Sequence, residues 1–150
     1  MKGQSEKVVR EILGKITDAE RTNYDRINLE LSKKRLGWYD KNRDYAESLE
    51  GTDVRKAYTL LMTYLGINPE QAPVVYEDER KIVWRSYNWC PVLEACKHGG
   101  FDTRTVCRKG WEQSVQALIE KINPKLRFSR NYEKLRPYAE YCEEFIELIE

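Results

Sequence analysis

Four cysteines and one histidine are the residues of this chain best suited to nucleophilic or metal chemistry near neutral pH. Three of the cysteines and the histidine lie in one stretch, from Asn88 to Cys107. A thiolate attacks electrophilic carbon or binds a metal ion, and an imidazole can transfer a proton. We therefore expect the chemistry of the protein, if it has any, in this stretch.

Cys90 is the first candidate nucleophile. It precedes Pro91, and a proline at the first position of a helix would place Cys90 at the helix N-cap. The N-terminus of a helix carries about half a positive charge, which can lower the pKa of a thiol below its usual value of about 8.5. The alternative interpretation is structural, because free cysteines are small, apolar and often buried.

The other cysteines also have two interpretations each. Cys96 lies four residues after Val92 on the apolar side of a short expected helix, which favours core packing. Cys107 falls near the start of a long expected helix, where a catalytic and a structural role are both open, and Cys142 opens the last expected strand. The spacing of Cys90, Cys96, Cys107 and Cys142 along the chain lacks the Cys-x2-Cys pair found in most structural zinc sites. Zinc bound by all four is kept as an alternative to a metal-free site.

A nucleophilic cysteine needs a group that handles protons. His98 is separated from Cys90 by one short helix, about 12 Å at the helical rise, so direct contact is not expected. A histidine in that position more often caps the last carbonyls of its helix. The carboxylates of Asp102 and Glu144, and also that of Glu94, are the candidates for proton transfer.

Arg130 is the candidate for binding a substrate carboxylate. Residues 125–132 alternate as in a β-strand, and a strand that includes Arg130 would direct it to the apolar face. An inward arginine needs a carboxylate partner, either Glu144 or a ligand. A strand that ends earlier would leave Arg130 in solvent. We favour this exposed interpretation, because arginine side chains are mostly exposed in proteins.

Most aromatic rings of the chain carry a polar atom, since ten tyrosines and four tryptophans stand against three phenylalanines. Such rings suit the wall of a ligand pocket, although they equally suit the edge of an ordinary core. Trp89 and Tyr132 lie beside the candidate groups. We expect them to contact a substrate.

Composition excludes several classes of protein. With 26 basic and 25 acidic residues, the chain lacks the basic excess typical of a nucleic-acid-binding protein. No stretch approaches the roughly 20 apolar residues that span a bilayer, and the first residues lead into no apolar signal segment. We expect a cytoplasmic protein with reduced cysteines and a small-molecule ligand, bound to neither membrane nor nucleic acid. A homodimer is a further hypothesis, because residues 1–66 carry more charged helix than a small sheet needs.

The elements that would position these residues predict an α+β domain. Helices are expected over residues 5–16, 18–36, 38–50, 53–65, 91–99 and 103–122, and strands over residues 74–76, 81–87, 125–132 and 141–149. Thr17 and Glu20 form an apparent capping box before the second helix, and Gly37 is expected to end it. The prediction is one domain, residues 1–150, with a helical part over 1–66. Its second part, over 74–150, is a mostly antiparallel four-stranded sheet with two helices packed on it.

Four segments of the second half contain the cysteines of the chain together with Pro91 and Pro124. They are Trp89–Cys96, Cys107–Arg108, Asn123–Phe128 and Tyr141–Glu144. Together they resemble the L-2-amino-thiazoline-4-carboxylic acid hydrolase family over about residues 74–150. The resemblance implies a hydrolase that opens a cyclic thiazoline amino acid, with Cys90, Cys107 and Cys142 at the family's cysteine positions. The alternative is a non-catalytic domain that binds or senses a small ligand.

Overall fold

The computed structural model describes residues 2–149, and within them it contains seven α-helices and four strands. The helical first part consists of α1 (Lys2–Arg21), α2 (Asp25–Lys41), α3 (Arg43–Ser48) and α4 (Asp53–Leu65). It is followed by a short 3-10 helix (Pro69–Gln71), β1 (Val74–Glu77), β2 (Lys81–Ser86), α5 (Pro91–Gly99), α6 (Thr103–Gly110), α7 (Glu112–Ile119), β3 (Leu126–Arg130) and β4 (Cys142–Leu148). The predicted α+β class is confirmed. No helix within residues 2–149 is long and apolar enough to cross a membrane.

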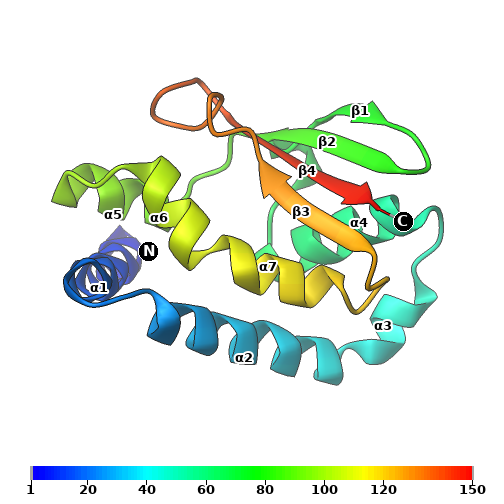
Figure 1. Cartoon of the computed structure of the whole chain (residues 1–150), viewed down its shortest axis with the longest axis horizontal. Helices are drawn as coiled ribbons and strands as arrows, with labels where there is room; N and C mark the ends of the chain where they lie inside the picture. The colour runs from blue at the N-terminus through cyan, green and yellow to red at the C-terminus, as the bar shows by residue number, and fades with distance from the viewer. Residues whose placement is uncertain (1, 150) are drawn as a thin grey trace.

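The four strands form one antiparallel sheet in the order β1-β2-β4-β3 (Figure 1). The predicted hairpin of β1 and β2 closes on Asp78, whose carboxylate accepts hydrogen bonds from the backbone N–H groups of Arg80 (2.8 Å) and Lys81 (2.9 Å). This arrangement places β2 and β4 side by side at the centre of the sheet. Residues near the end of β2 therefore lie next to residues at the start of β4.

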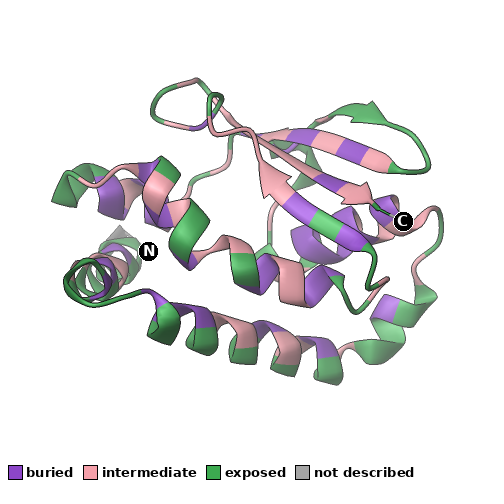
Figure 2. Cartoon of the chain, viewed as in Figure 1, coloured by how far each residue is buried: buried purple, intermediate pink, exposed green. Residues whose placement is uncertain are grey.

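One face of the sheet packs on α4 and α7, which are the two helices that cover it (Figures 1 and 2). Alternation along β2 buries Ile82, Trp84 and Ser86 on this inner face. The main hydrophobic core fills the layer between sheet and helices; its largest members are Trp84, Leu60, Leu61, Ile82, Leu118, Ile119, Leu126 and Ile146. The sheet thus obtains its stability from the amphipathic faces of α4 and α7.

A second hydrophobic cluster lies at the other end of the molecule, where α1 packs against α5 (Figure 1). Its buried members include Val9, Ile16, Ile27, Val92, Ala95, Cys96 and Val106. Cys96 is 1% exposed, so the predicted core packing of this thiol is confirmed. Helix α2 joins the two ends, and the side-chain amide of Asn28 donates to the Lys109 carbonyl (2.9 Å) at the end of α6.

The single helix predicted over residues 103–122 is wrong, because the chain breaks at Trp111 into α6 and α7. Gly110 lies against the ring of Tyr24, and a Cβ atom at this glycine would come within 2.9 Å of the ring. The end of α6 thus lies in close contact with the N-cap residue of α2, where only a glycine fits without displacing the ring. The apolar spacing of the sequence continues through the break and gives no sign of it.

The predicted boundary between the first two helices is also wrong. Helix α1 continues to Arg21, and the hydroxyl of Thr17 donates to the carbonyl of Leu13 (2.8 Å) within the helix instead of capping a new one. Helix α2 begins after Asn23, whose side-chain oxygen accepts from the N–H of Asp25 (3.0 Å). It then runs past Gly37 to Lys41, because a single glycine lowers helix stability without ending the helix.

Candidate functional site

Cys90, Cys107 and Cys142 lie in one neighbourhood at the junction of the sheet with α5 and α6. Cys142 pairs with Ser86, at the point where β2 ends, and Cys90 follows as the N-cap of α5. Burial is the main cause of the raised pKa of the Cys90 and Cys107 thiols, and the charges of the neighbouring thiols add to it. Such an interaction weakens with distance, which places the thiols of Cys90, Cys107 and Cys142 in the same region of the molecule, and Cys96 acts on Cys107 as well.

The surroundings of Cys90 act against the expected thiolate. Burial raises the pKa of its thiol, although the N–H groups of Leu93 and Val92 and the charge of Arg136 act in the opposite direction. Burial likewise raises the pKa of Cys107 to about 12. The predicted lowering of the Cys90 pKa by the helix N-terminus is therefore wrong in sign, because desolvation outweighs the helix terminus at this position.

Arg136 is a site residue that sequence reasoning missed. Its Nε donates to the sulfur of Cys142 at 3.3 Å, its backbone N–H lies 3.5 Å from the same sulfur, and its Nη1 donates to the carbonyl of Asn88 at 2.7 Å. The guanidinium thus joins the loop before β4 to the segment before α5. Arg136 lies in the loop between β3 and β4, so the spacing of apolar residues could not predict which way its side chain points. The available signal in the sequence was a basic residue six positions before Cys142.

Arg130 and Glu144 form a largely buried ion pair near Cys107. They are partners across β3 and β4, with Nε 3.5 Å from Oε2, and their side chains are 11% and 15% exposed. Ser86 donates to the other oxygen of Glu144 at 2.7 Å. Burial lowers the pKa of Arg130, but the charge of Glu144 and then that of Cys107 outweigh it, so its pKa is raised. The favoured exposed interpretation of Arg130 is wrong, whereas the predicted partner Glu144 is confirmed.

Tyr132 extends this polar network towards α7. Its hydroxyl donates to the carboxylate of Glu112, and Arg130 Nη1 lies 3.9 Å from the same carboxylate. The guanidinium of Arg108 stacks 4.1 Å above the Tyr132 ring. Burial, followed by the hydrogen bond to Glu112, raises the pKa of Tyr132 to about 12. The network therefore connects β3 to both α6 and α7.

Asp102 has a different place from the other candidates. It caps α6 by accepting from the N–H of Arg104 (2.9 Å), and it pairs with the Arg104 guanidinium at 3.1 Å. The side-chain hydrogen bond from Arg104 is the main cause that lowers the pKa of Asp102. Burial raises the pKa of Cys96 to about 12, and the negative charge of Asp102 contributes to this rise. The structure thus places Asp102 near the Cys96 side of α5, bound in a surface ion pair.

The four cysteines do not form a metal centre in the structure. Within residues 2–149, no three side chains among His, Cys, Asp and Glu are grouped closely enough to hold a metal ion. Three thiols share a neighbourhood, but their surroundings supply guanidinium groups, which repel a cation. Residues 2–149 therefore offer no set of ligands for the zinc ion that was considered as an alternative.

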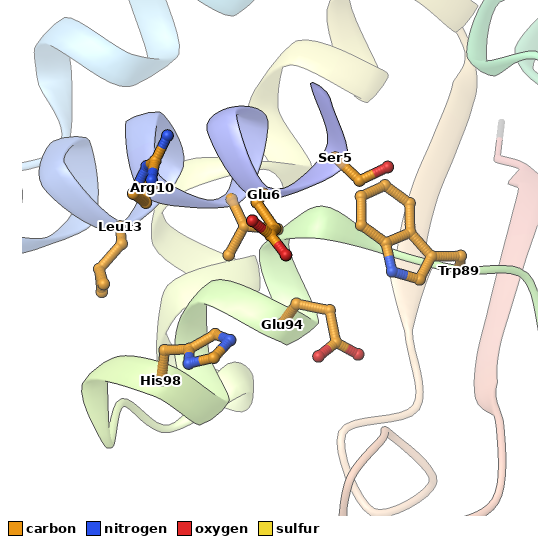
Figure 3. Close-up of a pocket in the computed structure, with 8 residues that line it drawn as sticks. Ser5, Glu6, Arg10, Leu13, Trp89, Glu94 and His98 are labelled. Atoms are coloured by element: carbon orange, nitrogen blue, oxygen red, sulfur yellow. The ribbon is translucent and has the colours of Figure 1, made fainter. Parts of the chain in front are cut away.

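A cavity of about 440 Å³ lies between α1 and α5 (Figure 3). Trp89 lies at one end of the cavity and His98 at the other. Trp89 is 53% exposed. Trp89 directly precedes Cys90, so the cavity begins next to the N-terminus of α5. The two residues expected to contact a substrate are thus separated, because Trp89 lines this cavity while Tyr132 belongs to the Arg130 network.

The residues at the sheet junction combine groups that nucleophilic catalysis requires. Cys142 offers a half-buried thiol, Arg136 a positive donor on its sulfur, and Glu144 a carboxylate on the same face of β4. Comparisons of the chain with models of protein families, with curated proteins and with solved structures each found no match. A functional assignment consequently starts from these residues and from the sequence resemblance.

Proposed function

We propose that this protein is a cysteine-dependent hydrolase of small, carboxylate-bearing molecules, as its resemblance to the L-2-amino-thiazoline-4-carboxylic acid hydrolases implies. The observation that carries the proposal is the contact between Arg136 Nε and Cys142 Sγ, 3.3 Å, in a neighbourhood with two further thiols. A charged donor aimed at a sulfur atom stabilises negative charge that develops there. We also propose that it acts in the cytoplasm, where the four free thiols would stay reduced.

In this mechanism Cys142 takes the place of Cys90 and Cys107 as the attacking thiol. As the Cys142 sulfur adds to the electrophilic carbon of an amide or cyclic amidine, its proton passes to Glu144 and then to the leaving atom, whose bond to that carbon breaks. Water then attacks the same carbon, the bond from this carbon to the Cys142 sulfur breaks, and the thiol regains a proton as the product leaves. Arg130 would bind the substrate carboxylate, since its Nη1 has no hydrogen-bond acceptor within residues 2–149. Glu144, two residues beyond Cys142 on the same face of β4, is the carboxylate for proton transfer, because Glu143 between them faces the other way and pairs with Arg85.

The proposal is tested with 2-amino-thiazoline-4-carboxylate as substrate and NMR detection of ring opening. We expect turnover by the natural sequence, a loss of at least 100-fold in Cys142→Ser, and a loss of at least 10-fold in Arg136→Gln. Cys96→Ala is the matched control, because this thiol is packed in the helical cluster. Equal activity in Cys142→Ser and the natural sequence would exclude the mechanism. No turnover of this substrate by the natural sequence would exclude the substrate implied by the resemblance.

A non-catalytic ligand-binding domain is the second candidate function. The cavity between α1 and α5 supports it, because a volume of about 440 Å³ suits a small organic ligand. This candidate predicts binding without turnover, and binding that does not depend on Cys142. Calorimetric titration of the Cys142→Ser variant therefore separates the two functions.

A further inference from the structure

The walls of the cavity between α1 and α5 are apolar at the base and charged at the rim. Val9 and Leu13 come from α1, and Trp89 closes one end (Figure 3). The residue Val9 is buried, whereas Trp89 keeps more than half of its surface exposed. An exposed tryptophan beside a cavity provides a large, rigid surface for a ligand at low cost in side-chain entropy.

Two acidic residues, Glu6 and Glu94, and two basic residues, Arg10 and His98, belong to the lining. Glu6 from α1 and Glu94 from α5 lie on facing helices, and both line the cavity (Figure 3). Glu94 has Lys97 at 3.8 Å, but this pair is exposed and contributes little. Arg10 also belongs to the lining, yet its guanidinium points away from the space between the helices in Figure 3. Two carboxylates on opposite sides repel an anionic ligand and attract a cation.

We propose that this cavity binds an organic ammonium ion that has an apolar body. The ammonium group would lie between Glu6 and Glu94, where two carboxylates accept its hydrogen bonds. The apolar body would lie on Val9 and Leu13 and against the face of Trp89, which also attracts a positive charge. The site adjoins the thiol neighbourhood at Trp89, but none of the four cysteines lines it, and it does not depend on the proposed hydrolase activity.

A neutral or anionic occupant fits these walls less well. An anion would have to approach both carboxylates at the rim, and screening by salt reduces this repulsion only in part at distances below about 8 Å. A neutral apolar molecule would gain the contact with Trp89, but it would desolvate the carboxylates at the rim without supplying a positive charge. The charge of the ligand is therefore the property that a test should vary.

Three probes of one shape test the proposal by calorimetric titration of the full chain. Phenethylamine is the cation, phenethyl alcohol the neutral analogue and phenylacetate the anion. We expect phenethylamine to bind at least 10-fold more tightly than the alcohol, and phenylacetate to bind more weakly than both. Comparable binding of all three probes would overturn the proposal, as would a lack of phenethylamine binding.

Variants then locate the bound amine. Glu94→Gln and Glu6→Gln should each weaken phenethylamine binding at least fivefold, while Glu11→Gln on the same helix as Glu6 should leave it unchanged. Binding of phenethylamine should change the tryptophan fluorescence of the protein. Trp89→Leu should weaken the binding and remove this fluorescence change. Circular dichroism confirms that each variant is folded. If both glutamine variants bind like the natural sequence, the ammonium site is not in this cavity. Phenethylamine binding by Cys142→Ser should equal that of the natural sequence, so failure of the hydrolase proposal leaves this test intact.

Discussion

Replacement of Arg35 by methionine should stabilise the protein. Arg35 lies on α2 and is 5% exposed, and neither its Nε nor its Nη1 meets a hydrogen-bond acceptor within residues 2–149. Its guanidinium lies 5.5 Å from the ring centre of Tyr64, and the positive Arg130 is close enough to act on it. Burial is the main cause that lowers the pKa of Arg35, which shows that its charged form is disfavoured there.

The size of the effect follows from the balance of these contacts. Burial of one ion costs several kcal/mol in a protein interior, and a desolvated cation–π contact returns only part of this, about 2 kcal/mol. Methionine keeps most of the length of the Arg35 side chain and packs without a charge. We therefore expect Arg35→Met to raise the free energy of unfolding by about 1–3 kcal/mol. For a chain of this size that corresponds to roughly 2–10 °C in the melting temperature.

Urea unfolding followed by circular dichroism measures the change. Arg26→Met is the matched control on the same helix, because the Arg26 side chain is 90% exposed and its pair with Glu30 is worth a few tenths of a kcal/mol. The control should shift stability by less than about 0.5 kcal/mol. A loss of more than about 1 kcal/mol in Arg35→Met would refute the reasoning, since it would mean that the guanidinium is well compensated.

Three further predictions concern the buried pair, the thiols and the helix break. Glu144→Gln should cost about 3 kcal/mol, because it leaves Arg130 with only the more distant carboxylate of Glu112, 3.9 Å away. The double variant Arg130→Met, Glu144→Leu should stay within about 2 kcal/mol of the natural sequence in urea unfolding. Because burial raises the pKa of Cys96 and Cys107 to about 12, the unfolded chain loses these protons first. Stability should be intact below pH ~8.5 and fall above it, by about 2 kcal/mol per thiol at pH ~10; a double alanine variant that shows the same fall would contradict this. Gly110→Ala should cost about 1–3 kcal/mol in thermal unfolding, through contact with the facing ring, and an unchanged melting temperature would show that α2 yields.

Local sequence signals predicted the chain where the cause was local. The Cys90-Pro91 pair marks the start of α5, and Asp102 caps α6 through its own side chain. Gly66 ends α4 in the left-handed conformation that glycine adopts most easily. Each of these effects involves atoms within a few residues of one another. That range is what a single sequence can express.

Tertiary contacts decided the features that the sequence left open. The break at Trp111 depends on the ring of Tyr24, and the burial of Arg130 depends on how far β3 pairs with β4. Strand alternation predicted the partner Glu144 correctly once the strand was taken to include Arg130. The contact of Arg136 with Cys142 lies within an irregular loop, for which no periodic rule exists. The residues that bring the candidate site together were thus the least predictable.

The inner face of the sheet changes character from one end to the other, and this gradient indicates where function lies. Paired residues of β2 and β4 run from Ile82 opposite Ile146, through Trp84 opposite Glu144, to Ser86 opposite Cys142. The apolar end packs under α4 and α7, whereas the polar end is joined through Arg136 to the segment before α5. Polar and ionised groups on a buried face cost stability unless they are paired, and apolar residues would fill the same positions at lower cost. Since the gradient does not help the core, a site that uses these groups is the simplest physical reason for it.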